Sequence, residues 1–274
     1  MKRSFKLNLM PSNPYQAIQK GEPGSIGWRI DYFQEAGSTQ RVAAELAEQG
    51  AAQGTVVIAE QQTAGRGRMG RQWHSPSGVN LYATIILRPT CPVAEVPRLS
   101  LVAGVAAAEA LEMAAPGIVA LKWPNDVWLN GLKAGGIIAE AVTDASRGLQ
   151  CVLLGIGLNL NLAARDIPPE LRGKATSVLI ATGYQCDRAA IASALLQKLD
   201  TRYMETERHG FATIRPLWER YSALTGRPVT VVDGGSRITG TVTGIDADGA
   251  LLLETAEGPT RILTGDVSIE GAYG

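Results

Sequence analysis

Cysteine and histidine are scarce in this chain of 274 residues. The three cysteines, Cys91, Cys151 and Cys186, are odd in number, lie far apart and show no Cys-x-x-Cys spacing. This pattern argues against a disulfide framework or a zinc site and fits a reducing cytoplasm. Only two histidines occur, His74 and His209, so a histidine-rich metal centre is excluded. The sequence therefore identifies no metal-ligating side chain.

The chain also lacks an excess of charge, a high aromatic content and any long apolar run. It carries 26 basic and 26 acidic side chains, so whole-chain charge gives no reason to expect a nucleic-acid-binding protein. No apolar run approaches the roughly 20 residues that span a bilayer. The apolar run at the N-terminus is too short for a signal peptide. We therefore expect a cytoplasmic protein with no membrane association.

Three regions differ in character along the chain. Residues 1–27 hold three prolines among scattered polar residues and predict an irregular lead-in. Residues 28–225 alternate strand-like apolar runs with segments of helical spacing. Residues 226–274 contain short β runs split by Asp-Gly and Gly-Gly turns, which predicts a small, barrel-like all-β domain. The expected organisation is thus a large domain followed by a small one.

The elements of the large region can be placed from their patterns. A helix should start at Ser38 or Thr39 and end at Gly50. Asn130-Gly131 is a strong two-residue hairpin signal. Strands are expected at residues 28–33, 55–60, 79–87, 118–123, 133–142 and 149–160, and further helices at 97–115, 188–209 and 211–223.

The stretch 63–78 is the most informative part of the sequence. It alternates three glycines with three arginines, Arg66, Arg68 and Arg71, and Trp73 closes the run. Glycine lets a ligand approach the main chain, and arginine offers a fork of donors suited to carboxylate and phosphate. Because two apolar strands flank it, we interpret this stretch as an anion-binding loop on a rigid scaffold. An exposed basic loop or an RNA contact is the alternative.

Two further positions have both a structural and a functional interpretation. Ser38 or Thr39 at a helix start can serve as an N-cap, which is worth about 1 kcal/mol. Lys133 is followed by Ala134, Gly135 and Gly136, so it lies beside open space. On spacing alone it is an exposed charge at the rim of a hairpin.

Four separated stretches together resemble one family. They are GSTQ at 37–40, QTAGRGRMGRQW at 62–73, KWPNDVWLNGLKAGG at 122–136 and GIGLNL at 155–160. In this order they are similar to the biotin–protein ligases, also called biotin–[acetyl-CoA-carboxylase] ligases, from about Trp28 to the end. The resemblance implies an α+β fold. Its mixed β-sheet, with helices on one side, would be class II tRNA synthetase-like, and its C-terminal domain would be an SH3-like β-barrel.

The resemblance also implies a two-step reaction. Biotin and ATP, with Mg²⁺, would first form biotinyl-5′-AMP and pyrophosphate. The biotinyl group would then pass to a lysine of a biotin carboxyl carrier domain in a biotin-dependent carboxylase. Since a carboxylate must approach a phosphate, cations have to offset the repulsion between two anions. Arg68 and Lys133 are the catalytic residues that the resemblance implies.

The same resemblance assigns the other site residues. Thr39 and Gln62 would bind the ureido ring of biotin, and Asp126 would arrange magnesium or Lys133. The biotin site implied in this way comprises Ser38, Thr39, Gln40, Gln62, Arg66, Gly67, Arg68 and Lys133. The ATP site comprises Arg71, Trp73, Asn125, Asp126 and Asn159. Gln40 is a departure, since many members have asparagine there.

Two alternatives and one exclusion complete the expectations. A lipoate or octanoyl transferase would share a related fold, but its arginine–glycine–glycine loop is absent from the sequence. An RNA-binding module would need a wider basic surface and more stacking aromatics than the 5% present. Residues 1–27 are too short for a DNA-binding domain, so we expect no specific DNA binding and no repressor role. The sequence leaves open whether the protein forms a homodimer.

Overall fold

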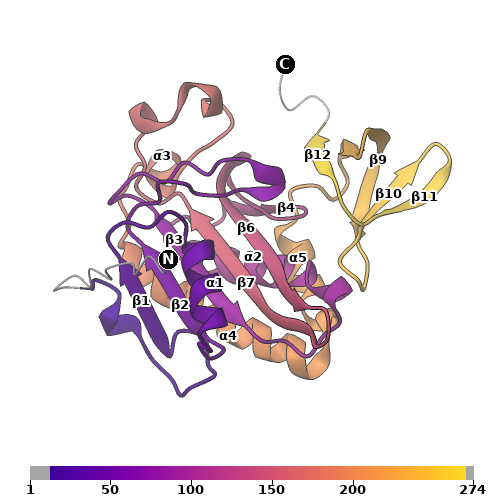
Figure 1. Cartoon of the computed structure of the whole chain (residues 1–274). Coiled ribbons are helices and arrows are strands. Elements are labelled where there is room, and N and C mark those ends of the chain that lie inside the picture. Colours follow the sequence, from indigo (N-terminus) through magenta and orange to yellow (C-terminus); the bar gives the residue numbers. More distant parts are fainter. Residues whose placement is uncertain (1–12, 270–274) are drawn as a thin grey trace.

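Two β-sheets form the framework of the protein (Figure 1). The computed structural model describes residues 13–269. The larger sheet has seven strands in the order β1-β2-β3-β7-β6-β5-β4, and the smaller has five in the order β11-β10-β9-β8-β12. The strands of the larger sheet are β1 Arg29–Phe33, β2 Thr55–Ala59, β3 Leu81–Leu87, β4 Val119–Lys122, β5 Asp126–Leu129, β6 Leu132–Asp144 and β7 Gly148–Leu158. The helices are α1 Thr39–Glu48, α2 Arg98–Leu111, α3 Val178–Thr182, α4 Arg188–His209 and α5 Arg215–Tyr221.

The larger sheet is mixed, as expected. Strands β1 and β2 run parallel, and every other neighbouring pair is antiparallel. Side chains alternate between the two faces of a strand. On β7, Val152, Leu154 and Ile156 enter the main core, whereas Cys151 and Leu153 belong to a second, smaller apolar cluster. Each face of the sheet therefore carries apolar side chains that another element has to bury.

Helices α2 and α4 cover the face with the main core. The α2 sequence is apolar almost all round, and twelve of its fourteen residues are buried, because α4 packs on its outer side. Gly104 faces the sheet, where an added Cβ would lie 3.6 Å from the Leu121 side chain. The expected buried helix is confirmed, and it forms the centre of the molecule.

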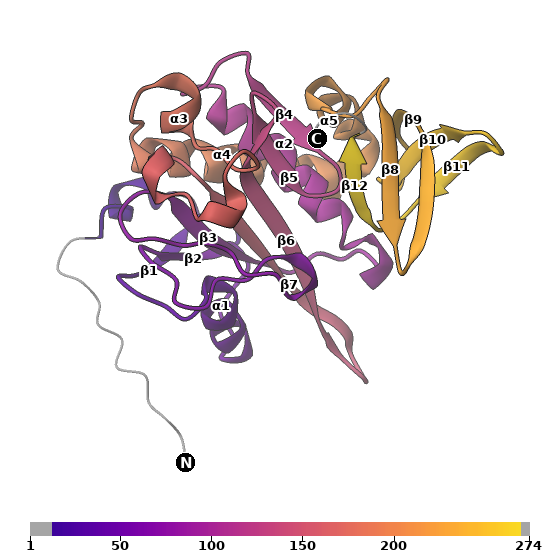
Figure 2. The ribbon, with the colours of Figure 1, turned by 90° about the horizontal axis from the view of Figure 1, so that it is seen from above.

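Helix α1 lies on the opposite face (Figure 2). Its Ala43 is fully buried against Val57, Ile86 and Leu153. The prediction of helices on one side is therefore correct for α2 and α4 and wrong for α1. The strand residues supply the reason. Val57 and Leu153 point away from the main core, so this part of the second face is apolar and requires a helix.

The hairpin predicted at Asn130-Gly131 is confirmed. Both residues have positive φ, 49° and 79°, as a type I′ turn requires. The sequence interpretation missed α3 and the final strand β12, both of five residues or fewer. Gly155 and Gly157 both lie inside β7, within the strand expected at residues 149–160.

The smaller sheet packs against the larger region through the turn before β10. Its strands are β8 Pro228–Asp233, β9 Ser236–Ile245, β10 Leu251–Thr255, β11 Gly258–Ile262 and β12 Asp266–Ile269. The Trp123 indole donates to the Gly249 carbonyl at 2.9 Å, and Arg98 pairs with Asp248 at 2.5 Å. An added Cβ at Gly249 would lie 2.7 Å from Leu101. The two sheets are thus in close contact beside Trp123.

The expected lead-in 1–27 lies partly outside the described residues. Within its described part, Gln16–Ile18 form a single 3-10 turn. Tyr15 is buried, and its ring packs on Tyr32 with centroids 5.7 Å apart. The backbone N–H of Ile26 donates to Asp200 on α4 at 2.7 Å. Residues 13–27 therefore pack against the large region.

Candidate active site

A pocket of about 500 Å³ lies on the face of the large sheet that carries α1. Its walls come from the start of α1, from the loop between β2 and β3, from β4 to β7 and from β12. All thirteen residues predicted for the site line it: Ser38, Thr39, Gln40, Gln62, Arg66, Gly67, Arg68, Arg71, Trp73, Asn125, Asp126, Lys133 and Asn159. The structure therefore brings together the four motifs that the sequence separates by up to 120 residues.

The floor of the pocket is built from glycines. Along β7 the face that carries Leu153 under α1 continues with Gly155 and Gly157, so the apolar layer gives way to open space. An added Cβ at Gly157 would lie 2.7 Å from Nε1 of Trp73, and one at Gly136 would lie 3.2 Å from the same ring. The Trp73 indole thus lies directly on the strand backbones.

The α1 end of the pocket holds a chain of hydrogen bonds. The Thr84 hydroxyl donates to Thr39 Oγ1 at 2.8 Å, and Thr39 donates to Gln62 Oε1 at 3.1 Å. The Gln62 amide then donates to Ser75 Oγ at 3.0 Å. These bonds fix Gln62, so its orientation is set before a ligand enters.

Two polar atoms at the same end are buried and find no hydrogen-bond partner among residues 13–269. They are Oγ of Ser38 and Oε1 of Gln40. Ser38 occupies the N-cap position of α1, yet its side chain makes no capping hydrogen bond. The purely structural N-cap role is therefore wrong for Ser38. A buried polar group without a partner costs about 1–3 kcal/mol, a cost that a polar ligand in the pocket would offset.

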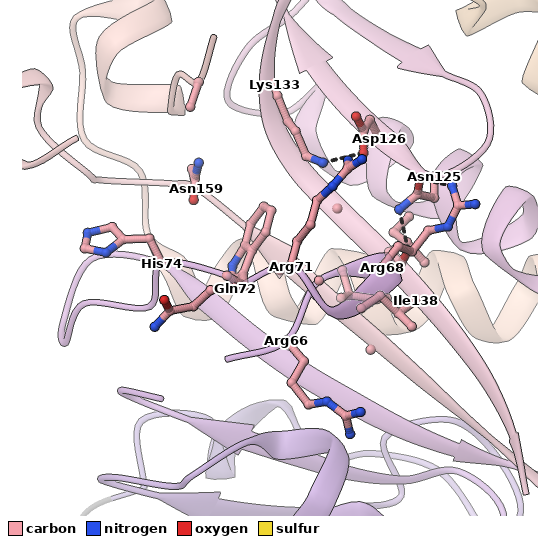
Figure 3. A pocket seen from close by; sticks show the side chains of 18 of the residues that line it. Arg66, Arg68, Arg71, Gln72, His74, Asn125, Asp126, Lys133, Ile138 and Asn159 are labelled. Carbon is pink, nitrogen blue, oxygen red and sulfur yellow. Dashed lines mark hydrogen bonds and ion pairs between the residues drawn. The ribbon is translucent and has the colours of Figure 1, made fainter. Parts of the chain in front are cut away.

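Cations gather at the other end of the pocket (Figure 3). Nζ of Lys133 lies 2.5 Å from Asp126 and 5.6 Å from the centroid of the Trp73 ring. Nη1 of Arg68 donates to Asn125 Oδ1 at 3.0 Å. Lys133 is therefore not the exposed rim charge that spacing alone suggested, because it faces the pocket between a carboxylate and an indole.

The arginine loop forms a short hairpin above this end. Arg66 pairs with Gln72 in an isolated β-bridge, and the Trp73 N–H donates to the Gly65 carbonyl at 3.0 Å. Figure 3 shows the Arg66 side chain pointing away from Lys133, Asp126 and Asn125. The backbone of the loop is thus anchored, but its arginines point in different directions.

Asn159 is held by the protein itself. Its Nδ2 donates to the Thr176 carbonyl at 3.0 Å, and its Oδ1 accepts from Asn80 at 3.3 Å. Oδ1 of Asn80 in turn accepts from the Leu160 N–H at 3.0 Å. Asn159 lines the pocket, but its amide already has partners at both ends.

Three charged residues of the pocket, Lys122, Lys174 and Asp266, were missed by the sequence interpretation. Lys122, the first residue of the KWPND stretch, lines the pocket beside Asp126. Asp266, at the start of β12, also lines it and forms an ion pair with Arg71. The motif containing Lys122 was a usable signal for that residue. No local pattern marks Asp266, because only the docking of the second sheet brings it to the pocket.

The described residues offer no ready metal centre. Within residues 13–269 no group of three or more histidine, cysteine, aspartate or glutamate side chains could hold a metal ion. In the same part of the chain no helix is both long enough and apolar enough to cross a bilayer.

The sequence and the fold match those of protein ligases for biotin and lipoate. The model of the Biotin/lipoate A/B protein ligase family matches residues 32–159, and the model of the Biotin protein ligase C terminal domain matches residues 224–269. A bifunctional ligase/repressor, BirA, from Bacillus subtilis is 40% identical over 98% of this chain and 86% of its own length. The chain therefore belongs to the biotin protein ligase family and is an enzyme.

Two other similar proteins agree with this assignment. A biotin–[acetyl-CoA-carboxylase] ligase of Mycobacterium tuberculosis is 35% identical over 88% of this chain and 89% of its own length. The structure of the Aquifex aeolicus biotin protein ligase in complex with biotin and ATP has a TM-score of 0.77 and 31% identity. It covers 88% of this chain and 98% of the Aquifex chain. These similarities favour a biotin ligase over lipoate transfer or an RNA-binding module.

Proposed function

We propose that this enzyme activates biotin with ATP to biotinyl-5′-AMP and then transfers biotin to a lysine of a biotin carboxyl carrier domain. The observation that carries the proposal is the single pocket that all thirteen predicted residues line. One end of it offers buried polar atoms without partners, and the other offers cations. A molecule with a polar ring at one end and a carboxylate at the other fits that arrangement.

The ureido ring of biotin would occupy the α1 end. The ring carries two N–H donors and a carbonyl acceptor, and such groups need matching partners in a buried site. Gln40 Oε1 can accept a hydrogen bond, and the Ser38 hydroxyl can donate or accept one. Thr39 and Gln62 are already fixed by their mutual hydrogen bonds. This end therefore supports recognition of the ring with little reorganisation.

The reacting groups would meet at Lys133 and Arg68. An oxygen of the biotin carboxylate attacks the α-phosphorus, and the bond to the bridging oxygen of pyrophosphate breaks. The Lys133 ammonium and the Arg68 guanidinium would stabilise the charge that two approaching anions bring together. In the second step the carrier lysine attacks the acyl carbon, and AMP leaves. No nucleophilic side chain of the enzyme is required.

Magnesium would enter with the nucleotide. Mg²⁺ keeps several waters and commonly binds one or two carboxylates together with substrate phosphates. Asp126 and Asp266 are the carboxylates of the pocket lining, and each already pairs with a cation. We therefore propose that the phosphates of ATP hold the ion, with Asp126 as the side chain beside it.

The remaining proposals concern architecture and context. We assign residues 28–225 to a class II tRNA synthetase-like catalytic domain and 226–274 to an SH3-like domain. The separate five-stranded antiparallel sheet that starts at Pro228 supports that division. We further propose a cytoplasmic enzyme without a repressor role.

The direct test is to look for the adenylate. The protein is mixed with biotin, ATP and Mg²⁺, and biotinyl-AMP and pyrophosphate are measured by mass spectrometry and a coupled assay. Each component is left out in turn, and lipoate replaces biotin in a parallel reaction. An isolated carrier domain is then added, and its lysine is tested for biotin. Folded protein that makes no adenylate, or that prefers lipoate, would refute the proposal.

A further inference from the structure

Four cations line one end of the pocket, and within residues 13–269 two of them, Arg68 and Lys122, have no ionic partner. Lys133 pairs with Asp126 and Arg71 with Asp266, while Arg68 donates to the side chain of Asn125. Among residues 13–269 no carboxylate lies within 4 Å of Nζ of the fourth cation, Lys122. That group instead lies 5.2 Å from the centroid of the Trp128 ring. Lys122 is thus a cation that can pair with an anionic ligand.

The strand geometry directs Lys122 towards the pocket. It is the last residue of β4, where Leu121 points into the main core and Lys122 to the other face. Its register partner is Asp126 on β5. Burial lowers the pKa of the Lys122 ammonium, and the carboxylates of Asp126 and Asp266 oppose that shift only in part. An anion bound in the pocket would restore the stability of the charged form.

The order of the strands gives the position of Lys122 along the pocket. The polar end for the ureido ring lies at α1 and β3, and Lys133 lies on β6. Lys122 is on β4, two strands beyond β6. Since neighbouring strands are about 4.8 Å apart, the backbone of Lys122 lies roughly 10 Å beyond that of Lys133. The far wall is formed by Asp266, Val267 and Ser268 of the second sheet.

A triphosphate would extend along this line. The proposed function puts the biotin carboxylate and the α-phosphate at Lys133 and Arg68. The β- and γ-phosphates then have to extend either towards β4 and the second sheet or back over the ureido end. The polar atoms of the ureido end are neutral, whereas the β4 end carries Lys122 and Arg71. Charge complementarity favours the direction towards Lys122.

We infer that Lys122 is a catalytic residue that binds the β- and γ-phosphates of ATP and stabilises the pyrophosphate leaving group. This inference rests on the proposed function. When the carboxylate oxygen bonds to the α-phosphorus, the electron pair of the breaking P–O bond stays on pyrophosphate. The Lys122 ammonium offsets that charge without giving up a proton. It has no part in the second step, because pyrophosphate has already left.

The two half-reactions separate this role from a structural one. We would compare wild type with Lys122→Gln and Lys122→Arg. Lys198→Gln removes the same charge from an exposed position on α4 and serves as the matched control. Adenylate formation is followed at varied ATP, and pyrophosphate is added as a product inhibitor. Transfer from preformed biotinyl-AMP to a carrier lysine is measured separately, as are biotin affinity and thermal stability.

For Lys122→Gln we expect kcat/KM for ATP to fall by about 10- to 100-fold, as the loss of a charge-assisted hydrogen bond predicts. Inhibition by pyrophosphate should weaken by a similar factor. Biotin affinity and the transfer step should match wild type. Lys122→Arg keeps the charge and should retain most of the inhibition by pyrophosphate, and Lys198→Gln should behave as wild type.

Three results would overturn the inference. The first is a Lys122→Gln variant with wild-type kcat/KM for ATP and wild-type pyrophosphate inhibition in a preparation that makes biotinyl-AMP. The second is an equal loss in both half-reactions or in biotin affinity, which would indicate a structural role. The third applies if wild type makes no adenylate, so that the proposed function fails. Lys122 is then tested alone by calorimetric titration of wild type and Lys122→Gln with inorganic pyrophosphate. Equal affinities of the two proteins for pyrophosphate would exclude the inferred role of Lys122.

Discussion

Replacing Gly157 by alanine should specifically damage the use of ATP. Gly157 lies in the extended backbone of β7, so alanine introduces no backbone strain. Its Cβ would, however, lie 2.7 Å from Nε1 and 2.8 Å from Cε2 of Trp73. Ordinary contacts between such atoms are about 3.5–4.0 Å. The indole that is predicted to contact the nucleotide must therefore shift by roughly 1 Å.

The size of the effect follows from the cost of that shift. Added atoms in a well-packed site typically cost 1–3 kcal/mol, and each 1.4 kcal/mol is a factor of ten. Trp73 is half-buried and carried by a loop, so we expect the lower part of that range. We predict a loss of about tenfold in kcat/KM for ATP. Stability should change little, because alanine also reduces the entropy of the unfolded chain by about 0.4–1 kcal/mol.

The assay is pyrophosphate release at varied ATP and saturating biotin, together with a thermal melt. Gly136→Ala is the graded comparison, because its Cβ would lie 3.2 Å from the Trp73 ring and requires a smaller shift. Gly104→Ala is the control on the opposite face, since its nearest contact is 3.6 Å away. A helix interior also favours alanine over glycine, so this control should be active and at least as stable as wild type.

The reasoning predicts the order Gly157→Ala, Gly136→Ala, Gly104→Ala for the loss in kcat/KM. If Gly157→Ala keeps the wild-type value for ATP while remaining folded, Trp73 does not form the wall of the nucleotide site. If biotin affinity falls and the ATP dependence does not change, the indole contacts biotin instead.

Three other predictions concern the arginine loop and DNA. Arg68→Gly should speed release of the adenylate and allow labelling of lysines outside the carrier. Lys133→Gln should instead slow adenylate formation. The two effects are distinguished by measuring the off-rate of the adenylate and the off-target labelling for both variants beside wild type. Asp266→Asn should lower KM for ATP by about two- to fivefold at low salt. The exposed ion pair between Arg71 and Asp266, worth up to about 1 kcal/mol, then no longer competes with ATP for Arg71. A KM for ATP that is unchanged or raised at low salt contradicts this prediction. The protein should shift DNA without sequence preference and only at low salt, and a sequence-dependent shift at physiological salt would exclude this expectation.

The sequence alone determined most of the strands and helices. Periodicity was sufficient for α2 and for α4, which the structure gives with the predicted bounds Arg188–His209. The Asn130-Gly131 dipeptide was sufficient for the hairpin. These elements carry their signals locally, in caps, turn residues and unbroken apolar faces. The thirteen residues predicted for the site, which four short motifs mark, all line one pocket, and their roles stay predictions.

Only the tertiary structure decided what depends on contacts between distant segments. The position of α1 on the second face follows from which side chains of β2 and β7 point away from the core, and that depends on strand register. Gly155 and Gly157 form the floor of the pocket because side chains from other segments pack over them, Gln40 over Gly155 and Trp73 over Gly157. Asp266 reaches Arg71, 195 residues away, because the second sheet docks beside the pocket. A contact of that separation leaves no local pattern, since docking rather than sequence spacing sets the distance.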